Sequence, residues 1–166
     1  MIEDTLKLLS KLCLVNKAKI ATAESCTGGL VAMLITDQAG SSQWFDRGFV
    51  TYTNLAKQQM LGVAESLLVT HGAVSEPVAQ AMAEGALKHS QAHYALAITG
   101  IAGPGGGSET KPVGMVCFAW AYYREQGNLI EVHSSSQYFS GDRQSVREQS
   151  ALFSLTELLN RLKINS

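Results

Sequence analysis

The chain has 166 residues, of which 46% are apolar and 16% charged, and its net charge at neutral pH is -1. These values fit one folded domain, exclude a disordered chain, and give no electrostatic reason to expect nucleic acid or an anionic membrane as partner. The three cysteines form no CxxC pair, no apolar run could span a bilayer, and residues 1–4 do not resemble a signal peptide. We therefore expect a single soluble domain over residues 1–166, located in the cytoplasm.

Apolar side chains that recur every three or four residues predict helices. In chain order, these segments are residues 2–15, 27–38, 55–61, 64–71 (a short helix or turn), a stretch that begins at 75–77, and 142–163. Short apolar runs, some alternating and some nearly continuous, predict strands. They occupy residues 19–23, 47–53, 94–99, 113–123 and 129–139.

The order of these elements predicts the fold class. Helices alternate with strands in the first part of the chain, a pattern typical of parallel strands covered by helices. The last two strands are joined by a short turn at residues 125–128, so they should form an antiparallel hairpin. We therefore expect an α/β fold, a single layered domain with a mixed β-sheet flanked by helices.

The first polar cluster is residues 22–29, Thr-Ala-Glu-Ser-Cys-Thr-Gly-Gly, where a strand turns into a helix. Unpaired main-chain N–H groups gather at such a junction, so Ser25 is a candidate nucleophile beside a candidate oxyanion site. Ser and Thr are also ordinary N-cap residues, and the octapeptide alone leaves both interpretations open. Cys26 is a second candidate nucleophile, because a helix N-terminus can lower the pKa of a thiol.

A second cluster contains Tyr52, at the end of the predicted second strand, and Lys57, in the first turn of the helix after it, with Asn54 as the expected N-cap. A lysine can serve as a general base if burial lowers its pKa toward neutrality, and Ser-Lys pairs use such a base in place of histidine. The alternatives are core packing for Tyr52 and a solvated position on the helix for Lys57.

Glycines dominate a third cluster, residues 99–108, which follows a buried strand. The loop lacks the Lys-Ser/Thr of a P-loop and is followed by no helix, so it is either a ligand-binding loop or a flexible one. Arg143 and Arg147 lie one helical turn apart and could hold a phosphate or form a surface pair with acidic neighbours. His89 and His93 have a metal-ligand spacing but lack a third ligand, so we expect no metal.

Together these clusters are similar to the CinA C-terminal domain family. The resemblance rests on seven blocks that follow one another along nearly the whole chain. They are residues 23–29 (AESCTGG), 40–42 (GSS), 52–57 (YTNLAK), 72–75 (GAVS), 99–104 (TGIAGP), 111–114 (KPVG) and 139–143 (FSGDR). Since longer members carry an extra N-terminal domain, this chain resembles the stand-alone members.

The resemblance implies an amidase that hydrolyses the carboxamide of nicotinamide mononucleotide, without metal or other cofactor. Carried onto matching positions, Ser25 is the expected nucleophile, with Lys57 and Tyr52 as its activating partners. From the chemistry alone, we expect main-chain N–H groups near Cys26 to Gly28, Thr27 included, or in the Thr99-Gly100 segment, to stabilise the oxyanion. Arg143 and the loop that contains Gly103 are candidates for binding the ribose phosphate.

Two other functions stay open at this point. The chain could be a non-catalytic nucleotide-binding or adaptor module of the competence/damage-inducible type, or an amidase for another small amide. Apolar stripes on the two terminal helices could also serve a homodimer contact.

Overall fold

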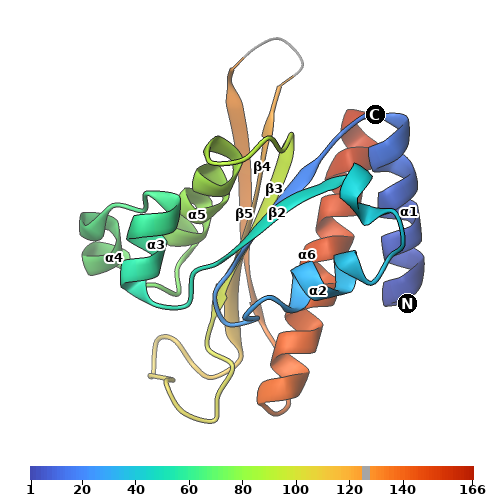
Figure 1. Ribbon diagram of the computed structural model, residues 1–166. Helices are drawn as coiled ribbons and strands as arrows, with labels where there is room; N and C mark the ends of the chain where they lie inside the picture. The colour runs from blue at the N-terminus through green and yellow to red at the C-terminus, as the bar shows by residue number, and fades with distance from the viewer. Residues whose placement is uncertain (125–127) are drawn as a thin grey trace.

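The computed structural model describes residues 1–124 and 128–166 and contains one five-stranded sheet between two layers of helices (Figure 1). The strands are β1 (Ile20–Glu24), β2 (Phe45–Val50), β3 (Tyr94–Gly100), β4 (Met115–Tyr123) and β5 (Ile130–Tyr138). The α-helices are α1 (Ile2–Val15), α2 (Leu30–Thr36), α3 (Asn54–Leu61), α4 (Glu65–His71), α5 (Glu76–Lys88) and α6 (Arg143–Asn165). A short 3-10 turn, η1 (Ser41–Gln43), precedes β2.

The strands lie in the order β2-β1-β3-β4-β5. β1 is parallel to both β2 and β3, whereas β4 runs antiparallel to β3 and to β5. The predicted mixed sheet and the late hairpin are therefore confirmed, although residues 125–127 of its predicted turn lie outside the described part of the chain.

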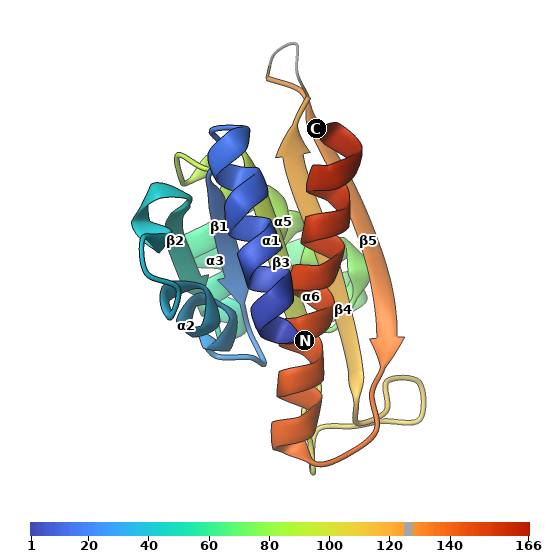
Figure 2. The same cartoon turned by 90° about the vertical axis from the view of Figure 1, so that its right-hand side faces the viewer.

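The two faces of the sheet are covered differently (Figures 1 and 2). On one face, α1, α2 and α6 cover a core of large side chains that includes the fully buried Trp44. On the other face, α5 lies over alanines of the strands, which allow the helix to approach the sheet closely.

The terminal helices α1 and α6 lie side by side on the same face of the sheet. Their apolar stripes, represented by Leu6, Leu9, Leu155 and Leu159, are buried within the chain. A homodimer through these stripes stays a prediction, and most of the apolar surface that suggested it is already covered.

Several predicted boundaries were wrong. Two successive glycines with positive φ, Gly28 (58°) and Gly29 (102°), delay the start of α2 to Leu30, because an α-helix requires negative φ. β2 begins at Phe45 and ends at Val50, so Tyr52 lies beyond the strand rather than at its end. The N-cap of α3 is Thr53, whose Oγ1 accepts a hydrogen bond from the Ala56 N–H at 3.1 Å, and not Asn54.

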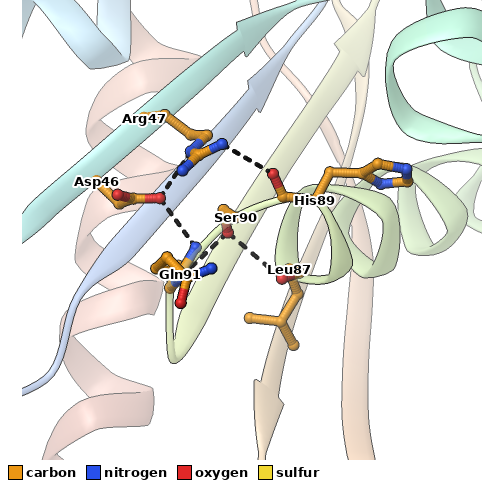
Figure 3. Close-up of polar contacts among 7 residues, drawn as sticks. Asp46, Arg47, Leu87, His89, Ser90 and Gln91 are labelled. Carbon is orange, nitrogen blue, oxygen red and sulfur yellow. Dashed lines mark hydrogen bonds and ion pairs between the residues drawn. The ribbon is translucent and has the colours of Figure 1, made fainter.

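At the amino ends of the parallel strands, Asp46 ties the edge strand β2 to the segment between α5 and β3 (Figure 3). Its carboxylate accepts hydrogen bonds from the Arg47 side chain at 2.7 Å and the Gln91 N–H at 3.0 Å, and Arg47 in turn donates to the His89 carbonyl. Burial alone would raise the pKa of Asp46, but these donors outweigh it and hold that pKa below its usual value. This cluster fixes the sheet edge at the end opposite the polar clusters found in the sequence.

Candidate active site

The polar clusters meet at the carboxyl ends of β1, β2 and β3. After β1 the chain forms β2 on one side, and it later returns to form β3 on the other side. Loops that leave neighbouring parallel strands in opposite directions open a crevice at this edge of the sheet. A hollow of about 200 Å³ lies there. It is lined by Ser25, Cys26, Tyr52, Asn54, Lys57, Ala73, Val74, Thr99, Gly100, Ala102 and Arg143.

Ser25 is the first residue after β1 and is held from two sides. Its main-chain N–H donates to the carbonyl of Ile98 in β3 at 2.9 Å, which continues the pairing of the two strands. Its Oγ lies 3.3 Å from the main-chain carbonyl of Tyr52 and 3.0 Å from Nζ of Lys57. The hydroxyl is therefore fixed at the wall of the hollow beside an amine.

Lys57 lies in the first turn of α3, which the Thr53 cap holds in place, and its side chain is only 1% exposed. Nζ contacts the carbonyl oxygens of Thr51 at 3.1 Å and Tyr52 at 3.2 Å, in addition to Ser25. No carboxylate in the described part of the chain forms an ion pair with it. Burial lowers the pKa of Lys57 below its ordinary value, because the charged form loses its hydration.

The Lys57 amine has enough hydrogen-bond partners in either protonation state. A charged Lys57 donates three hydrogen bonds, to the Thr51 and Tyr52 carbonyls and to Ser25 Oγ. A neutral Lys57 donates to the two carbonyls and keeps a lone pair that can accept the Ser25 hydroxyl proton. The pair can therefore exchange a proton without leaving a buried polar group unpaired.

The turn after Ser25 keeps main-chain N–H groups free. The Gly28 N–H donates to the Ser25 carbonyl at 3.0 Å, but no acceptor in the described residues pairs with the N–H groups of Cys26 and Thr27. These two groups are the available donors for an oxyanion beside Ser25.

The cap of α2 comes from Glu24, which was not among the candidate residues in the sequence. The Glu24 carboxylate accepts hydrogen bonds from the N–H groups of Val31 at 2.8 Å and Ala32 at 3.1 Å. The hydroxyl of Thr27, an expected cap, is buried and has no hydrogen-bond partner among the described residues. An acidic residue near the start of a helix stabilises that helix, so the position of Glu24 in the sequence could have predicted this cap.

Cys26 does not have the property that made it a second candidate nucleophile. It is 7% exposed, and burial raises the pKa of its thiol to about 12. The thiolate is the reactive form, so this burial argues against Cys26 as a nucleophile.

Tyr52 contacts Ser25 and Lys57 through its main chain rather than through its side chain. The side chain is 55% exposed, and its hydroxyl accepts a hydrogen bond from an Arg143 nitrogen at 2.8 Å. Arg143 also donates to the carbonyl of Gly103 at 2.8 Å. The phenol therefore belongs to the rim of the hollow, where it positions the Arg143 guanidinium.

The glycine-rich loop contributes to the hollow at its start. Thr99 and Gly100 line it, and the Thr99 hydroxyl donates to the Ala73 carbonyl at 2.9 Å, which connects β3 to the segment before α5. Thr27, Gly28 and Gly103 do not line this hollow. Gly103 borders it indirectly, through Arg143.

Arg143 and Arg147 point to different partners. Arg147 donates to the carbonyls of Cys26 and Thr27, both at 3.1 Å, and not to an acidic neighbour. A second hollow, of about 400 Å³, also has Arg143 in its lining. Its lining is Leu30, Arg143, Gln144, Arg147 and Glu148.

The histidine pair has local structural partners. His93 Nδ1 accepts from the Lys19 N–H at 2.9 Å, and His89 Nδ1 lies 2.8 Å from the Gly85 carbonyl. Within residues 1–124 and 128–166, no group of three or more His, Cys, Asp or Glu side chains is arranged to hold a metal ion. Across the same residues, no helix is both long enough and apolar enough to cross a membrane.

Comparison with known proteins places the chain in a family. The model of the CinA C-terminal domain matches residues 3–162. Over 149 residues the chain is 56% identical to the nicotinamide-nucleotide amidohydrolase PncC of Escherichia coli K12, covering 90% of this chain and 87% of that protein. A CinA-like protein of Syntrophobacter fumaroxidans is 54% identical over 133 residues, which are 80% of this chain and 30% of that longer protein.

Solved structures agree with this placement. The crystal structure of the competence/damage inducible protein CihA from Agrobacterium tumefaciens superposes with a TM-score of 0.88 at 46% identity, over 98% of this chain and 95% of that one. A CinA superfamily protein from Klebsiella pneumoniae gives 0.90 at 34% identity, over 99% of both chains.

Proposed function

This chain belongs to the CinA C-terminal domain family, and we propose that it is a nicotinamide-nucleotide amidohydrolase that works through a serine acyl-enzyme. On this proposal residues 1–166 form one amidase domain that converts nicotinamide mononucleotide and water to nicotinate mononucleotide and ammonia. The observation that carries the mechanism is the buried contact of 3.0 Å between Lys57 Nζ and Ser25 Oγ. The similarity to PncC supports the substrate.

In the first half of the reaction, Ser25 Oγ attacks the carboxamide carbon while its proton moves to neutral Lys57. The negative charge that develops on the carboxamide oxygen is stabilised by the free N–H groups of Cys26 and Thr27. When the intermediate collapses, the carbon–nitrogen bond breaks. Lys57 then returns its proton to the leaving nitrogen, which departs as ammonia and leaves an ester on Ser25.

In the second half, water attacks the ester carbon and gives a proton to Lys57. The carbon–Oγ bond then breaks, the same proton returns to Ser25, and the nicotinic acid that forms gives the remaining proton of the water to solvent to become the carboxylate. Each half of the reaction therefore uses one proton transfer to Lys57 and one from it. Both protonation states of the amine have their hydrogen bonds in this site, which supports such a cycle.

The arrangement of the two hollows supports an orientation for the substrate. The smaller one, beside Ser25, accommodates the pyridine carboxamide, and Arg143 stands between it and the second hollow. With the carboxamide at Ser25, the ribose phosphate extends toward Arg143, whose guanidinium is suited to a phosphate. Thr99 and Gly100 would form the wall against the ring, and Gly103 would support Arg143.

Two features of the cysteines support action in the reducing cytoplasm. Cys13, Cys26 and Cys117 are all buried, and all three are free thiols rather than disulfide partners, as is usual in a reducing compartment.

The test is ammonia release from nicotinamide mononucleotide by the purified chain. We expect Ser25→Ala to lower the rate at least about a thousandfold and Lys57→Met about a hundredfold or more. Ser66→Ala and Lys11→Met, at exposed positions on α4 and α1, are the matched controls and should keep the wild-type rate.

Two results would count against this function. Undiminished turnover by Ser25→Ala would remove the serine mechanism. A wild-type chain that is stabilised by the nucleotide but releases no ammonia would instead be a binding module.

A further inference from the structure

Arg147 lies in the second turn of α6, about 120 residues along the chain from the nucleophile, yet it is bound to the nucleophile turn. Its Nε donates to the Cys26 carbonyl at 3.1 Å, and a terminal guanidinium nitrogen donates to the Thr27 carbonyl at 3.1 Å. That guanidinium also lies against Gly28, where an added Cβ would be 3.5 Å from it. One side chain thus binds Cys26 and Thr27, the two residues that follow Ser25, and lies beside the third, Gly28.

The turn needs this contact because its glycines interrupt the helical hydrogen bonds. In a regular helix the Cys26 carbonyl would accept from the N–H of Leu30, but that N–H donates to Thr27 instead, at 3.0 Å. Within the described residues, the Cys26 carbonyl has no main-chain donor, and Arg147 supplies one. A buried carbonyl left unpaired would cost stability, so the turn would relax to another conformation without Arg147.

Because a trans peptide is planar, the hydrogen bond from Arg147 to the Cys26 carbonyl also fixes the direction of the N–H in the same peptide. In the peptide that joins Cys26 to Thr27, the carbonyl and the N–H point in opposite directions. Because Arg147 holds the Cys26 carbonyl, the Thr27 N–H points away from Arg147. The peptide before it is held in the same manner, since the Ser25 carbonyl accepts from the Gly28 N–H and leaves the Cys26 N–H free.

The positive charge has a second effect on the same peptide. A guanidinium on a carbonyl oxygen strengthens the dipole of that peptide and makes its N–H a better donor. The Thr27 N–H, which would bind the developing oxyanion, is part of the peptide that receives the Nε hydrogen bond. Arg147 can therefore favour the transition state without touching the substrate.

We propose that Arg147 is a positioning residue for the nucleophile turn, which aims and polarises the Thr27 N–H, one of the two groups that stabilise the oxyanion at Ser25. This inference rests on the proposed serine mechanism. It differs from a phosphate-binding role for Arg147, which the presence of Arg147 at the edge of the larger hollow would otherwise suggest.

The two roles are separated by steady-state kinetics with nicotinamide mononucleotide. For Arg147→Lys and Arg147→Ala we expect kcat to fall about tenfold or more, because oxyanion stabilisation acts in the transition state, while KM changes less than about threefold. Added guanidinium chloride at millimolar concentration should restore part of kcat in Arg147→Ala. Lys163→Met, which removes one positive charge from an exposed position on the same helix, should keep both constants.

A second readout does not depend on the substrate. Phenylmethanesulfonyl fluoride forms a bond between its sulfur and Ser25 Oγ, fluoride leaves, and the hydroxyl proton passes to Lys57. The rate of this modification, followed by intact mass, should fall in both Arg147 variants by a factor similar to that in kcat. Thermal unfolding of each variant identifies any loss that comes from misfolding.

The outcomes are distinct. A higher KM with unchanged kcat would assign Arg147 to the substrate and overturn the inference. Unchanged kcat and labelling rate in folded variants would overturn it as well. A wild-type chain with neither ammonia release nor labelling would overturn the serine mechanism itself, and this inference with it.

Discussion

Lys57 Nζ lies 3.0 Å from Ser25 Oγ, although Ser25 directly follows β1 and Lys57 lies in the first turn of α3. The remaining hydrogen bonds of the amine go to the main-chain carbonyls of Thr51 and Tyr52. A base that is oriented by carbonyl oxygens keeps its position whether or not it carries a proton. A carboxylate in their place would favour the charged form and weaken the base.

The protonation of Lys57 should set the pH dependence of turnover. Only the neutral amine can accept the Ser25 proton, so kcat/KM should rise with pH through one ionisation whose pKa lies below 10.5, the ordinary value for lysine. Initial rates of ammonia release across a pH series give this pKa directly. A rate that falls as pH rises through that ionisation would mean that Lys57 acts in its charged form.

Burial of Lys57 should also appear in the stability of the protein. Between its lowered folded-state pKa and 10.5, the unfolded state binds more protons, so the free energy of unfolding should rise with pH in this interval. Lys57→Met should lack this rise and stay within about 1 kcal/mol of wild type at pH 7, because lost hydrogen bonds are offset by the removed desolvation cost. Denaturant titrations at several pH values measure both effects.

The control for this experiment is Lys11→Met, at an exposed position on α1, which should keep the wild-type rise. If Lys57→Met retained the rise in full, the rise would have to come from other groups.

The Tyr52 hydroxyl should act through Arg143. The two side chains are joined by a hydrogen bond of 2.8 Å, whereas the contacts of Tyr52 with Ser25 and Lys57 use its main-chain carbonyl. Tyr52→Phe should therefore lower kcat/KM about three- to tenfold in the wild-type background, and much less once Arg143 is replaced by Met.

A double-mutant cycle on kcat/KM measures this coupling. Tyr138→Phe, at an exposed position on β5, is the control and should leave the rate unchanged. Equal losses from Tyr52→Phe in both backgrounds would instead support a role of the phenol in proton transfer at Ser25, the role first expected from the sequence.

Glu24 should contribute mainly to stability. Its carboxylate accepts the N–H groups of Val31 and Ala32 at the start of α2, and it is 1% exposed. Glu24→Gln keeps one acceptor oxygen and removes the charge, so it should lower the free energy of unfolding by about 1–2 kcal/mol. Chemical denaturation compares it with Glu109→Gln, an exposed control that should change stability little. An unchanged midpoint for Glu24→Gln would show that the cap is not required.

Much of the molecule could be predicted from local patterns. Nearly continuous apolar character marked the buried strand β3, and the apolar stripes of α1 and α6 marked the faces that now cover the sheet. Ser25, Tyr52 and Lys57 were expected together because their sequence blocks match one family, and the structure brings Ser25 and Lys57 into contact. The boundaries near Gly28 and at β2 were missed, because they depend on backbone conformation and on where a neighbouring strand ends.

Hydrophobic periodicity and short motifs are local properties of a chain, so they were enough to predict the class of fold and to mark Ser25 as a candidate nucleophile and Lys57 as a candidate base. Only the tertiary structure decided which partner each polar group has. Tyr52 presents a carbonyl to the site and its hydroxyl to Arg143, and Arg147 holds the turn after Ser25. The reason is physical: a hydrogen bond requires a donor and an acceptor about 3 Å apart. For residues separated by up to about 120 positions, only the packing of α6 on the face of the sheet creates that proximity.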